Sequence, residues 1–148
     1  MEFEQMFIDT AGKPVQYKGE TLLLYDQIEL LGKSEMILNI ESTSSRWRQG
    51  VMILFPREMH INIGSTKHLG KRLIFWEDTA PNDIKISWNE MTPNVKVYNA
   101  WEVDGQFHSL HNGTAMKKII KNNVVLYYCN DGYPDEDFDD IVFSLYLG

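Results

Sequence analysis

The chain has 148 residues, of which 43% are hydrophobic, 12% aromatic and 24% charged. This length allows one domain with a full apolar core, and the composition excludes a disordered or collagen-like protein. Fourteen lysines and arginines against 21 aspartates and glutamates give a net charge of −7, which argues against a general binder of nucleic acids or anionic membranes. We expect a single domain over residues 1–148.

The cysteine content and the first residues bear on location. The sequence begins Met1-Glu2-Phe3-Glu4, which is acidic where a secretory signal is basic, and no apolar stretch approaches the length of a membrane span, about 20 residues. The single cysteine, Cys129, cannot form an internal disulfide, which agrees with a reducing compartment. We therefore expect a cytoplasmic protein without a membrane partner.

Hydrophobic residues recur mostly with a period of two, which is the pattern of half-buried β-strands. The dense apolar segment 21–31 has no convincing helix cap, so we favour strand over helix there. The segment 115–121 contains better helix formers and is compatible with a single helical turn. Alternating strands are predicted at 36–40, 59–63, 84–88, 95–101 and 141–147, and short continuous apolar strands at 51–55 and 124–128.

Glycine, asparagine and aspartate lie between these strands, and they tolerate the positive φ angles of tight turns. The strongest hairpin prediction is Asp104-Gly105, which Val103 and Phe107 flank. Four prolines fall between apolar runs, and we expect them to bound strands rather than to interrupt a ladder: Pro56, Pro81, Pro93 and Pro134.

Many short strands with frequent turns predict an all-β fold. The expected architecture is two packed antiparallel sheets, a sandwich or jelly roll of about 9–11 short strands with at most one or two short helical turns. A closed β-barrel is the alternative.

An acidic segment precedes the last predicted strand. Six of the ten residues from Asp131 to Asp140 are carboxylates, and Asp135, Asp137 and Asp139 have the alternating spacing with which loops wrap Ca²⁺. The segment lacks the glycine and the glutamate of an EF-hand loop at the required positions. Three interpretations stay open: a solvated loop that protects an edge strand, a Ca²⁺ site, and a docking surface for a basic partner.

Basic residues gather in a different segment, 46–72, which holds six lysines and arginines and one glutamate. Trp47 lies between Arg46 and Arg48, where an indole could stack on a sugar or a base. The alternative is that the basic and acidic segments neutralise each other in the fold, or that both are solvated. The acidic balance of the chain argues against nucleic acid as the partner.

Four tryptophans are a generous supply for this length, and exposed indoles stack on sugar rings in carbohydrate-binding sandwiches. Trp88 and Trp101 share the parity of apolar neighbours on their strands, so we expect both in the core. Trp47 and Trp76 have polar neighbours, so we expect these two at the surface.

No catalytic motif is evident. Cys129 ends an apolar run and is expected to be a small strand residue rather than a nucleophile. His108 and His111 could share a metal ion only if the chain turned between them. Carboxylates for glycoside cleavage could meet only in space, and the first to inspect are Glu77, Asp78, Glu90 and Glu102.

Sequence thus predicts a protein that binds rather than catalyses. The first hypothesis is a ligand-recognition module, most plausibly for carbohydrate, with a possible Ca²⁺ in the acidic turn. The second is an acidic interaction protein, such as an immunity-like antagonist of a basic enzyme or toxin. The third is a small hydrolase or isomerase whose site is not visible in sequence. The residues expected to bind ligand are Arg46, Trp47, Arg48 and Trp76, and those expected to bind Ca²⁺ are Asp135, Asp137 and Asp139.

Overall fold

The computed structural model describes residues 2–111, 113–132 and 136–148, and it is almost entirely β-structure. Its one helix among these residues is α1 (Glu2–Asp9). Twelve strands follow in the described part of the chain: β1 (Val15–Tyr17), β2 (Glu20–Leu22), β3 (Asp26–Glu29), β4 (Glu35–Thr43), β5 (Arg48–Ile63), β6 (Thr66–Trp76), β7 (Ile84–Trp88), β8 (Asn94–Val103), β9 (Gln106–Ser109), β10 (Ala115–Lys121), β11 (Val124–Asn130) and β12 (Ile141–Tyr146).

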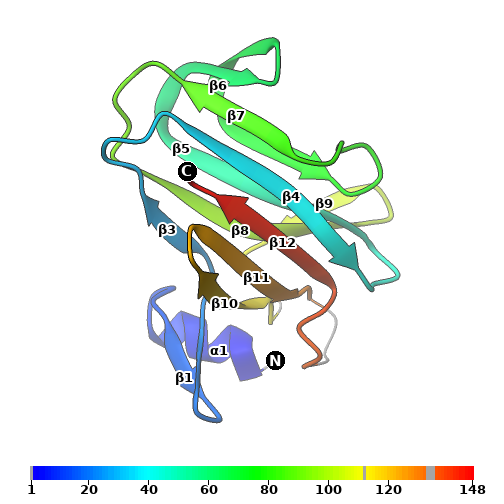
Figure 1. Ribbon diagram of the computed structural model, residues 1–148. Coiled ribbons are helices and arrows are strands. Elements are labelled where there is room, and N and C mark those ends of the chain that lie inside the picture. Colours follow the sequence, from blue (N-terminus) through cyan, green and yellow to red (C-terminus); the bar gives the residue numbers. More distant parts are fainter. Residues whose placement is uncertain (1, 112, 133–135) are drawn as a thin grey trace.

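Ten of these strands form one curled antiparallel sheet (Figure 1). Its strand order is β10-β11-β12-β4-β7-β5-β8-β3, with β6 paired to β5 and β9 paired to β8, while β1 and β2 form a small sheet of their own. The predicted all-β, antiparallel class is confirmed. The expected strand at 21–31 is confirmed in β2 and β3, whereas segment 115–121 is strand β10 and not a helical turn.

Strand β5 is the corner at which the sheet folds over. Its first half, Arg48 to Leu54, pairs with β8, and its last residues, Ile61 to Ile63, pair with β7, while β6 follows it along both halves. The register with β6 shifts between Leu54 and Met59. Pro56 lies in this shift, where its missing N–H costs no ladder hydrogen bond. The sequence prediction that Pro56 separates two strands was therefore wrong: it marks a bulge inside one long strand.

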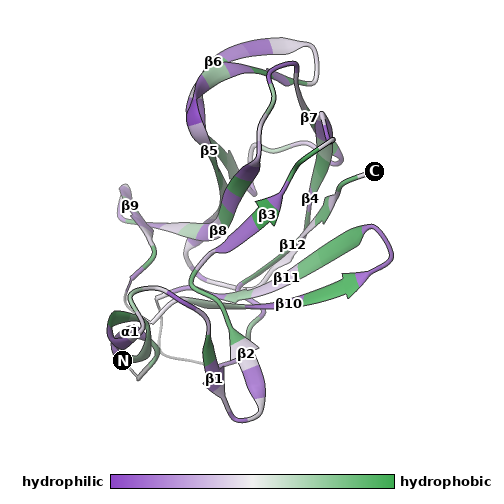
Figure 2. Cartoon of the chain, turned by 90° about the vertical axis from the view of Figure 1, so that its left-hand side faces the viewer, coloured by the Kyte–Doolittle hydropathy of each residue, from purple (hydrophilic) through white to green (hydrophobic). Residues whose placement is uncertain are grey.

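The two edges of the curled sheet approach each other and nearly close it (Figure 2). Leu23 and Met116 exchange two backbone hydrogen bonds of 2.9 and 2.8 Å, which tie the segment before β3 to β10. Beside them the Asp26 carboxylate accepts a hydrogen bond of 2.6 Å from the Tyr127 hydroxyl and pairs with the Lys118 ammonium at 3.1 Å. The architecture lies between the expected sandwich and the alternative closed barrel.

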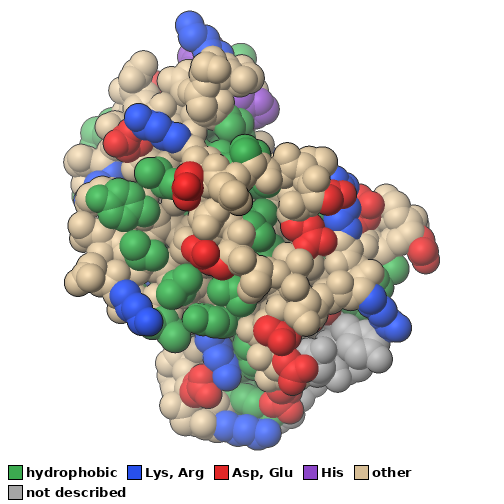
Figure 3. All heavy atoms as spheres, turned by 45° about the vertical axis from the view of Figure 1, so that its right-hand side comes forward, with side chains coloured by type: hydrophobic (Ala, Val, Ile, Leu, Met, Phe, Trp, Pro, Cys, Tyr) green, Lys and Arg blue, Asp and Glu red, His purple; other side chains and the backbone are tan. Residues whose placement is uncertain are grey.

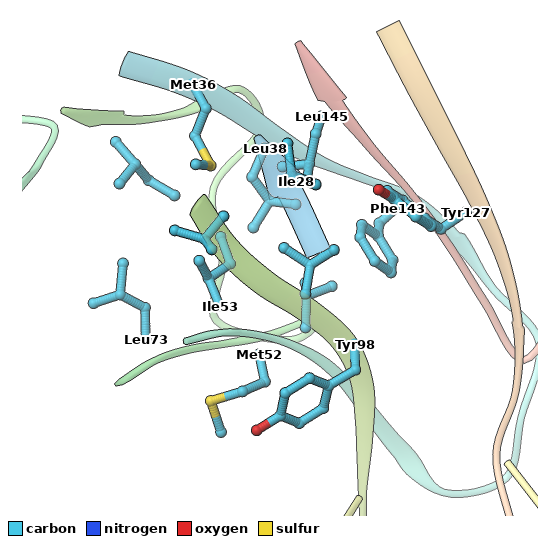
Figure 4. Packing of buried hydrophobic residues seen from close by; sticks show 14 of the residues in the cluster. Ile28, Met36, Leu38, Met52, Ile53, Leu73, Tyr98, Tyr127, Phe143 and Leu145 are labelled. Atoms are coloured by element: carbon cyan, nitrogen blue, oxygen red, sulfur yellow. The ribbon is translucent and has the colours of Figure 1, made fainter. Parts of the chain in front are cut away.

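The main core fills the interior that the curled sheet encloses (Figure 4). Alternating residues of β3, β4, β5, β11 and β12 supply it, as period-two strands require. The expected burial of two tryptophans is confirmed, since Trp88 is 2% exposed and Trp101 is 1% exposed. Within this core the rings of Tyr127 and Phe143 stack with centroids 4.8 Å apart.

A second, smaller apolar cluster holds α1 against the end of the sheet (Figure 2). Phe3 and Phe7, one helical turn apart, face this cluster from α1. Sequence analysis predicted no helix here. Its other fully buried members come from separate segments of the chain: Val15, Leu22, Ala115 and Phe138. No helix in the described residues has the length and apolarity needed to cross a membrane.

Candidate functional site

The β5–β6 pair brings together two of the residues that sequence analysis selected. Gly50 pairs with Trp76 in the antiparallel register, so both lie on the outward face of the sheet. A Cβ added at Gly50 would lie 2.8 Å from Cε3 of Trp76, which shows that the indole lies directly on the glycine backbone. Glycine in a strand often marks such a close approach.

Arg48 stands next to this indole and is held from three sides. Its Nε donates to Asp78 at 2.8 Å, its Nη1 lies 3.4 Å from a carboxylate oxygen of Glu102, and its guanidinium carbon lies 4.5 Å from the ring centre of Trp76. The hydrogen bond to Asp78 raises the pKa of Arg48, so the guanidinium keeps its charge. Phe107 of β9 meets Trp76 edge-on with ring centres 6.1 Å apart. The result is an aromatic and cationic group whose side chains hold one another in place.

A hollow of about 400 Å³ opens beside this group, where β4 and β6 end. Glu77 and Asp78 line it directly after Trp76, and Ile40, Ser42 and Thr43 line it from β4. The Oε2 atom of Glu77 is buried and has no hydrogen-bond partner among the described residues. A buried carboxylate oxygen without a donor is rare in folded proteins, and its partner can be an ordered water or a bound ligand.

Arg46 and Trp47 form their own pair directly before β5 begins. The guanidinium carbon of Arg46 lies 5.6 Å from the ring centre of Trp47, and the backbone N–H of Trp47 donates to the Ser45 hydroxyl at 3.2 Å. Arg46 is exposed, while Trp47 and Trp76 are both half-buried rather than fully at the surface. The expected ligand-binding residues therefore lie at one end of the sheet as two cation–aromatic pairs, Arg46 with Trp47 and Arg48 with Trp76.

The acidic segment is anchored at both ends by buried carboxylates. The Asp131 carboxylate is fully buried and accepts hydrogen bonds from the Ser45 hydroxyl at 2.7 Å and the Gln49 amide at 3.0 Å. Asp140 is 3% exposed and accepts a hydrogen bond of 2.9 Å from the Asp131 backbone N–H. Phe138 packs into the small apolar cluster between these anchors.

The structure describes two of the three expected Ca²⁺ ligands. Asp137 and Asp139 are exposed, and Asp135 lies outside the described residues. Within the described part of the chain, no group of three or more histidine, cysteine or carboxylate side chains is arranged to hold a metal ion. Figure 3 shows several acidic side chains along the lower part of one face. The described exposed carboxylates of this segment are Glu136, Asp137 and Asp139.

Cys129 is buried in β11, as its expected role of a small strand residue requires. Burial, with the charge of Asp140 as a smaller cause, raises its thiol pKa well above the ordinary value. A thiol that keeps its proton is a poor nucleophile.

The comparisons with known proteins identify no relative. No family model matches the chain, and searches of curated proteins and of solved structures found no significant match. The site therefore rests on its geometry alone. Sequence analysis did not select Ser42, Thr43 or Gly50; only the glycine gave a signal, because it stands beside the apolar run 51–55.

Proposed function

We propose that this protein is a non-catalytic recognition module that binds carbohydrate in the hollow between Thr43 and Asp78. The observation that carries the proposal is the buried Oε2 of Glu77, which has no donor among the described residues. Sugar hydroxyls are donors of the right kind. The hollow is within the size range of small-ligand sites, about 300 to 1,000 Å³.

The lining has the mixed chemistry that sugars require. Ser42 and Thr43 offer hydroxyls, and Glu77 and Asp78 offer carboxylate oxygens that accept from ring hydroxyls. Ile40 adds an apolar surface inside the hollow, and Asp78 links the hollow to Arg48, whose guanidinium lies against the Trp76 indole. Because Asp78 already binds Arg48 at 2.8 Å, little side-chain entropy is lost when a ligand arrives.

Calorimetric titration with a panel of hexoses and disaccharides tests this proposal. A binding sugar should lose at least about tenfold in affinity in Glu77→Gln, because one buried acceptor is replaced by a donor. Trp76→Ala should weaken the same sugar, and higher salt should change the affinity little.

Two matched controls keep this experiment specific. Glu35→Gln changes an exposed carboxylate that pairs with Lys85, and Tyr146→Ala removes an exposed aromatic ring from the far end of β12. Both should bind sugar as the wild type does. Absence of binding across the panel, or equal loss in the controls, would overturn the proposal. Release of reducing sugar would assign the hollow to a hydrolase instead.

A second function is supported by the anchored acidic segment. Buried Asp131 and Asp140 hold its ends, while Glu136, Asp137 and Asp139 are exposed and form a negative surface in its described part. Such a surface suits a basic protein partner, whose association it would accelerate in a salt-dependent manner. We place either function in the cytoplasm, on the basis of the single cysteine.

The salt dependence of capture distinguishes the two functions. A basic partner should be captured at low salt and lost at about 0.5 M salt, and the triple variant Glu136→Gln, Asp137→Asn, Asp139→Asn should not capture it. A capture that survives this triple variant would remove the second function.

Calcium stays a separate proposal for the same segment. Calorimetric titration with Ca²⁺ should release or absorb heat in the wild type and not in Asp137→Asn, Asp139→Asn if these carboxylates are ligands. A flat titration would remove the metal and leave the sugar site untouched.

A further inference from the structure

Two histidines that sequence analysis left apart meet in the structure. Nδ1 of His108 and Nε2 of His111 lie 3.2 Å apart. His108 is on β9, His111 follows two residues after this strand ends, and both side chains are half-buried. Neither residue belongs to the hollow beside Trp76.

A strained residue makes this meeting possible. Residues three apart in an extended strand face opposite ways, so the chain must turn between the two histidines. Leu110 supplies the turn with a φ of 59°, a left-handed conformation that a bulky side chain adopts only at a cost. Strain of this kind gathers at functional sites, and here it orders two imidazoles that would otherwise point apart.

The rings are also fixed by packing. Trp101 pairs with His108 in the register of β8 and β9, and its buried indole stacks on the His108 ring with centroids 6.0 Å apart. The His111 ring lies 5.7 Å from the same indole and 5.2 Å from the His108 ring. The backbone N–H of Thr114 donates to the His111 carbonyl at 3.3 Å. The indole thus forms a platform that limits where both ring nitrogens can go.

The distance between the two nitrogens matches that between two neighbouring ligands of one transition-metal ion. Zinc binds histidine nitrogen at about 2.0 to 2.1 Å, so two neighbouring ligands in a tetrahedral or octahedral shell lie about 2.9 to 3.4 Å apart. We propose that His108 and His111 bind a divalent transition-metal ion of the kind that prefers imidazole, with zinc as its representative. This site is independent of the proposed sugar-binding function.

The positions of the imidazole protons are compatible with metal binding by both rings. Each neutral imidazole carries one proton, and a hydrogen bond between the rings places one of them between Nδ1 of His108 and Nε2 of His111. Metal binding moves that proton to the other nitrogen of its own ring, so both facing lone pairs become ligands without a change in net protonation. Two protein ligands leave further positions for water or a small molecule.

The chain offers a matched control, since its other two histidines cannot act together. His68 pairs with Ile61 and shares its face of the β5–β6 pair, while His60, the preceding residue of β5, faces the opposite way. A site that depends on geometry, rather than on histidine content, must ignore His60 and His68.

Calorimetric titration of the full chain with Zn²⁺ tests the proposal. The wild type should bind one ion, His111→Ala should bind it at least about tenfold more weakly, and His60→Ala, His68→Ala should bind it as the wild type does. His108→Phe is the sharper variant, because it keeps a ring on Trp101 and removes the nitrogen.

Melting curves without metal establish that each variant folds. The imidazole proton resonances give a second readout, and Zn²⁺ should shift those of His108 and His111 but not those of His60 and His68. A wild type that gives no heat with Zn²⁺ would show that the two rings only hydrogen-bond to each other and would overturn the proposal. Unchanged affinity in both His108→Phe and His111→Ala, or equal loss in the His60 and His68 control, would overturn it as well.

Discussion

The main core and the small cluster around α1 are built in different ways. The main core takes alternate residues from long strands, so each strand contributes several side chains and the neighbouring strands repeat the pattern. The small cluster takes one or two side chains from each of α1, β1, β2, β10 and the acidic segment. The first core follows from periodicity within strands, and the second depends on contacts between segments that are remote in sequence.

This difference predicts two levels of stability. Among the described residues, the main core buries 24 hydrophobic residues, against six in the small cluster. Because local opening costs less where less apolar area is buried, α1 and its neighbours should open without unfolding the sheet. The following variants test that separation.

Phe143→Ala should have the largest effect. Phe143 is fully buried and stacks on Tyr127, so truncation leaves a cavity between the layers. We expect a loss of about 3 to 5 kcal/mol in the free energy of unfolding, measured by urea denaturation. The loss should be global, with hydrogen exchange accelerated in β5, β8 and β12 alike. A loss below about 1 kcal/mol would contradict the assignment of this residue to the main core.

Phe3→Ala should act locally. Phe3 packs edge-on against Tyr17 at 5.0 Å and lies 6.0 Å from the Phe138 ring. We expect α1 to open more easily by about 2 to 4 kcal/mol, with faster amide hydrogen exchange in α1 and the acidic segment. Exchange in β5 and β8 should stay as in the wild type, and acceleration there would merge the two regions into one cooperative unit.

Alkaline pH should weaken the main core through Tyr127. Burial, with the negative charge of Asp26 as a further cause, raises the pKa of Tyr127 far above its ordinary value. The unfolded chain loses this proton above a pH of about 10 while the folded chain keeps it, so stability is complete below that pH and falls as the pH rises further. The buried thiol of Cys129 has the same sign and acts from a pH of about 9.

Tyr127→Phe separates the hydroxyl from the ring. At neutral pH it should cost about 1 to 3 kcal/mol, because buried Asp26 loses its donor at 2.6 Å and keeps the Lys118 ammonium as its remaining described partner. Its melting temperature should then fall less steeply than that of the wild type between pH 9 and about 11. An identical alkaline slope in the two proteins would exclude Tyr127 as a source of the pH dependence.

Ile8→Ala should have the smallest effect. Ile8 is 62% exposed on α1, whereas the adjacent Phe7 is 4% exposed and faces the small cluster. We expect a change within about 0.5 kcal/mol for Ile8→Ala, with Phe7→Ala as the matched variant that opens α1. Equal effects of these two variants on hydrogen exchange would contradict the orientation of the helix.

Much of the fold could be predicted because hydrophobic residues that recur at every second position show which side of a strand faces the core. Trp88 and Trp101 were placed correctly in this way. The Asp104-Gly105 hairpin is also confirmed, since φ angles of 50° and 80° there match the left-handed turn that these residue types favour. The helical turn predicted at 115–121 was wrong, because pairing with β11 outweighs the helix propensity of these residues.

The candidate site could be predicted only in part. Arg48 and Trp76 were selected from composition, but their contact depends on the β5–β6 register, which one residue of slip would remove. The unpaired oxygen of Glu77 and the meeting of His108 with His111 depend on loop geometry after a strand ends. Periodicity carries no information about such positions, because it ceases where the strand ceases.

The joining of Leu23 to Met116 has a consequence for how copies of this chain behave in crowded solution. A curled sheet with two unpaired edge strands can pair with strands of other chains and grow into fibres. The hydrogen bonds between Leu23 and Met116 cover the first part of the β10 edge. Beyond it, three of the five residues from Lys117 to Lys121 are lysines, and charged side chains on an edge strand discourage a second chain from adding there, although Lys117 and Lys118 pair with Glu20 and Asp26. The same few residues that finish the fold thereby also help to keep it dispersed.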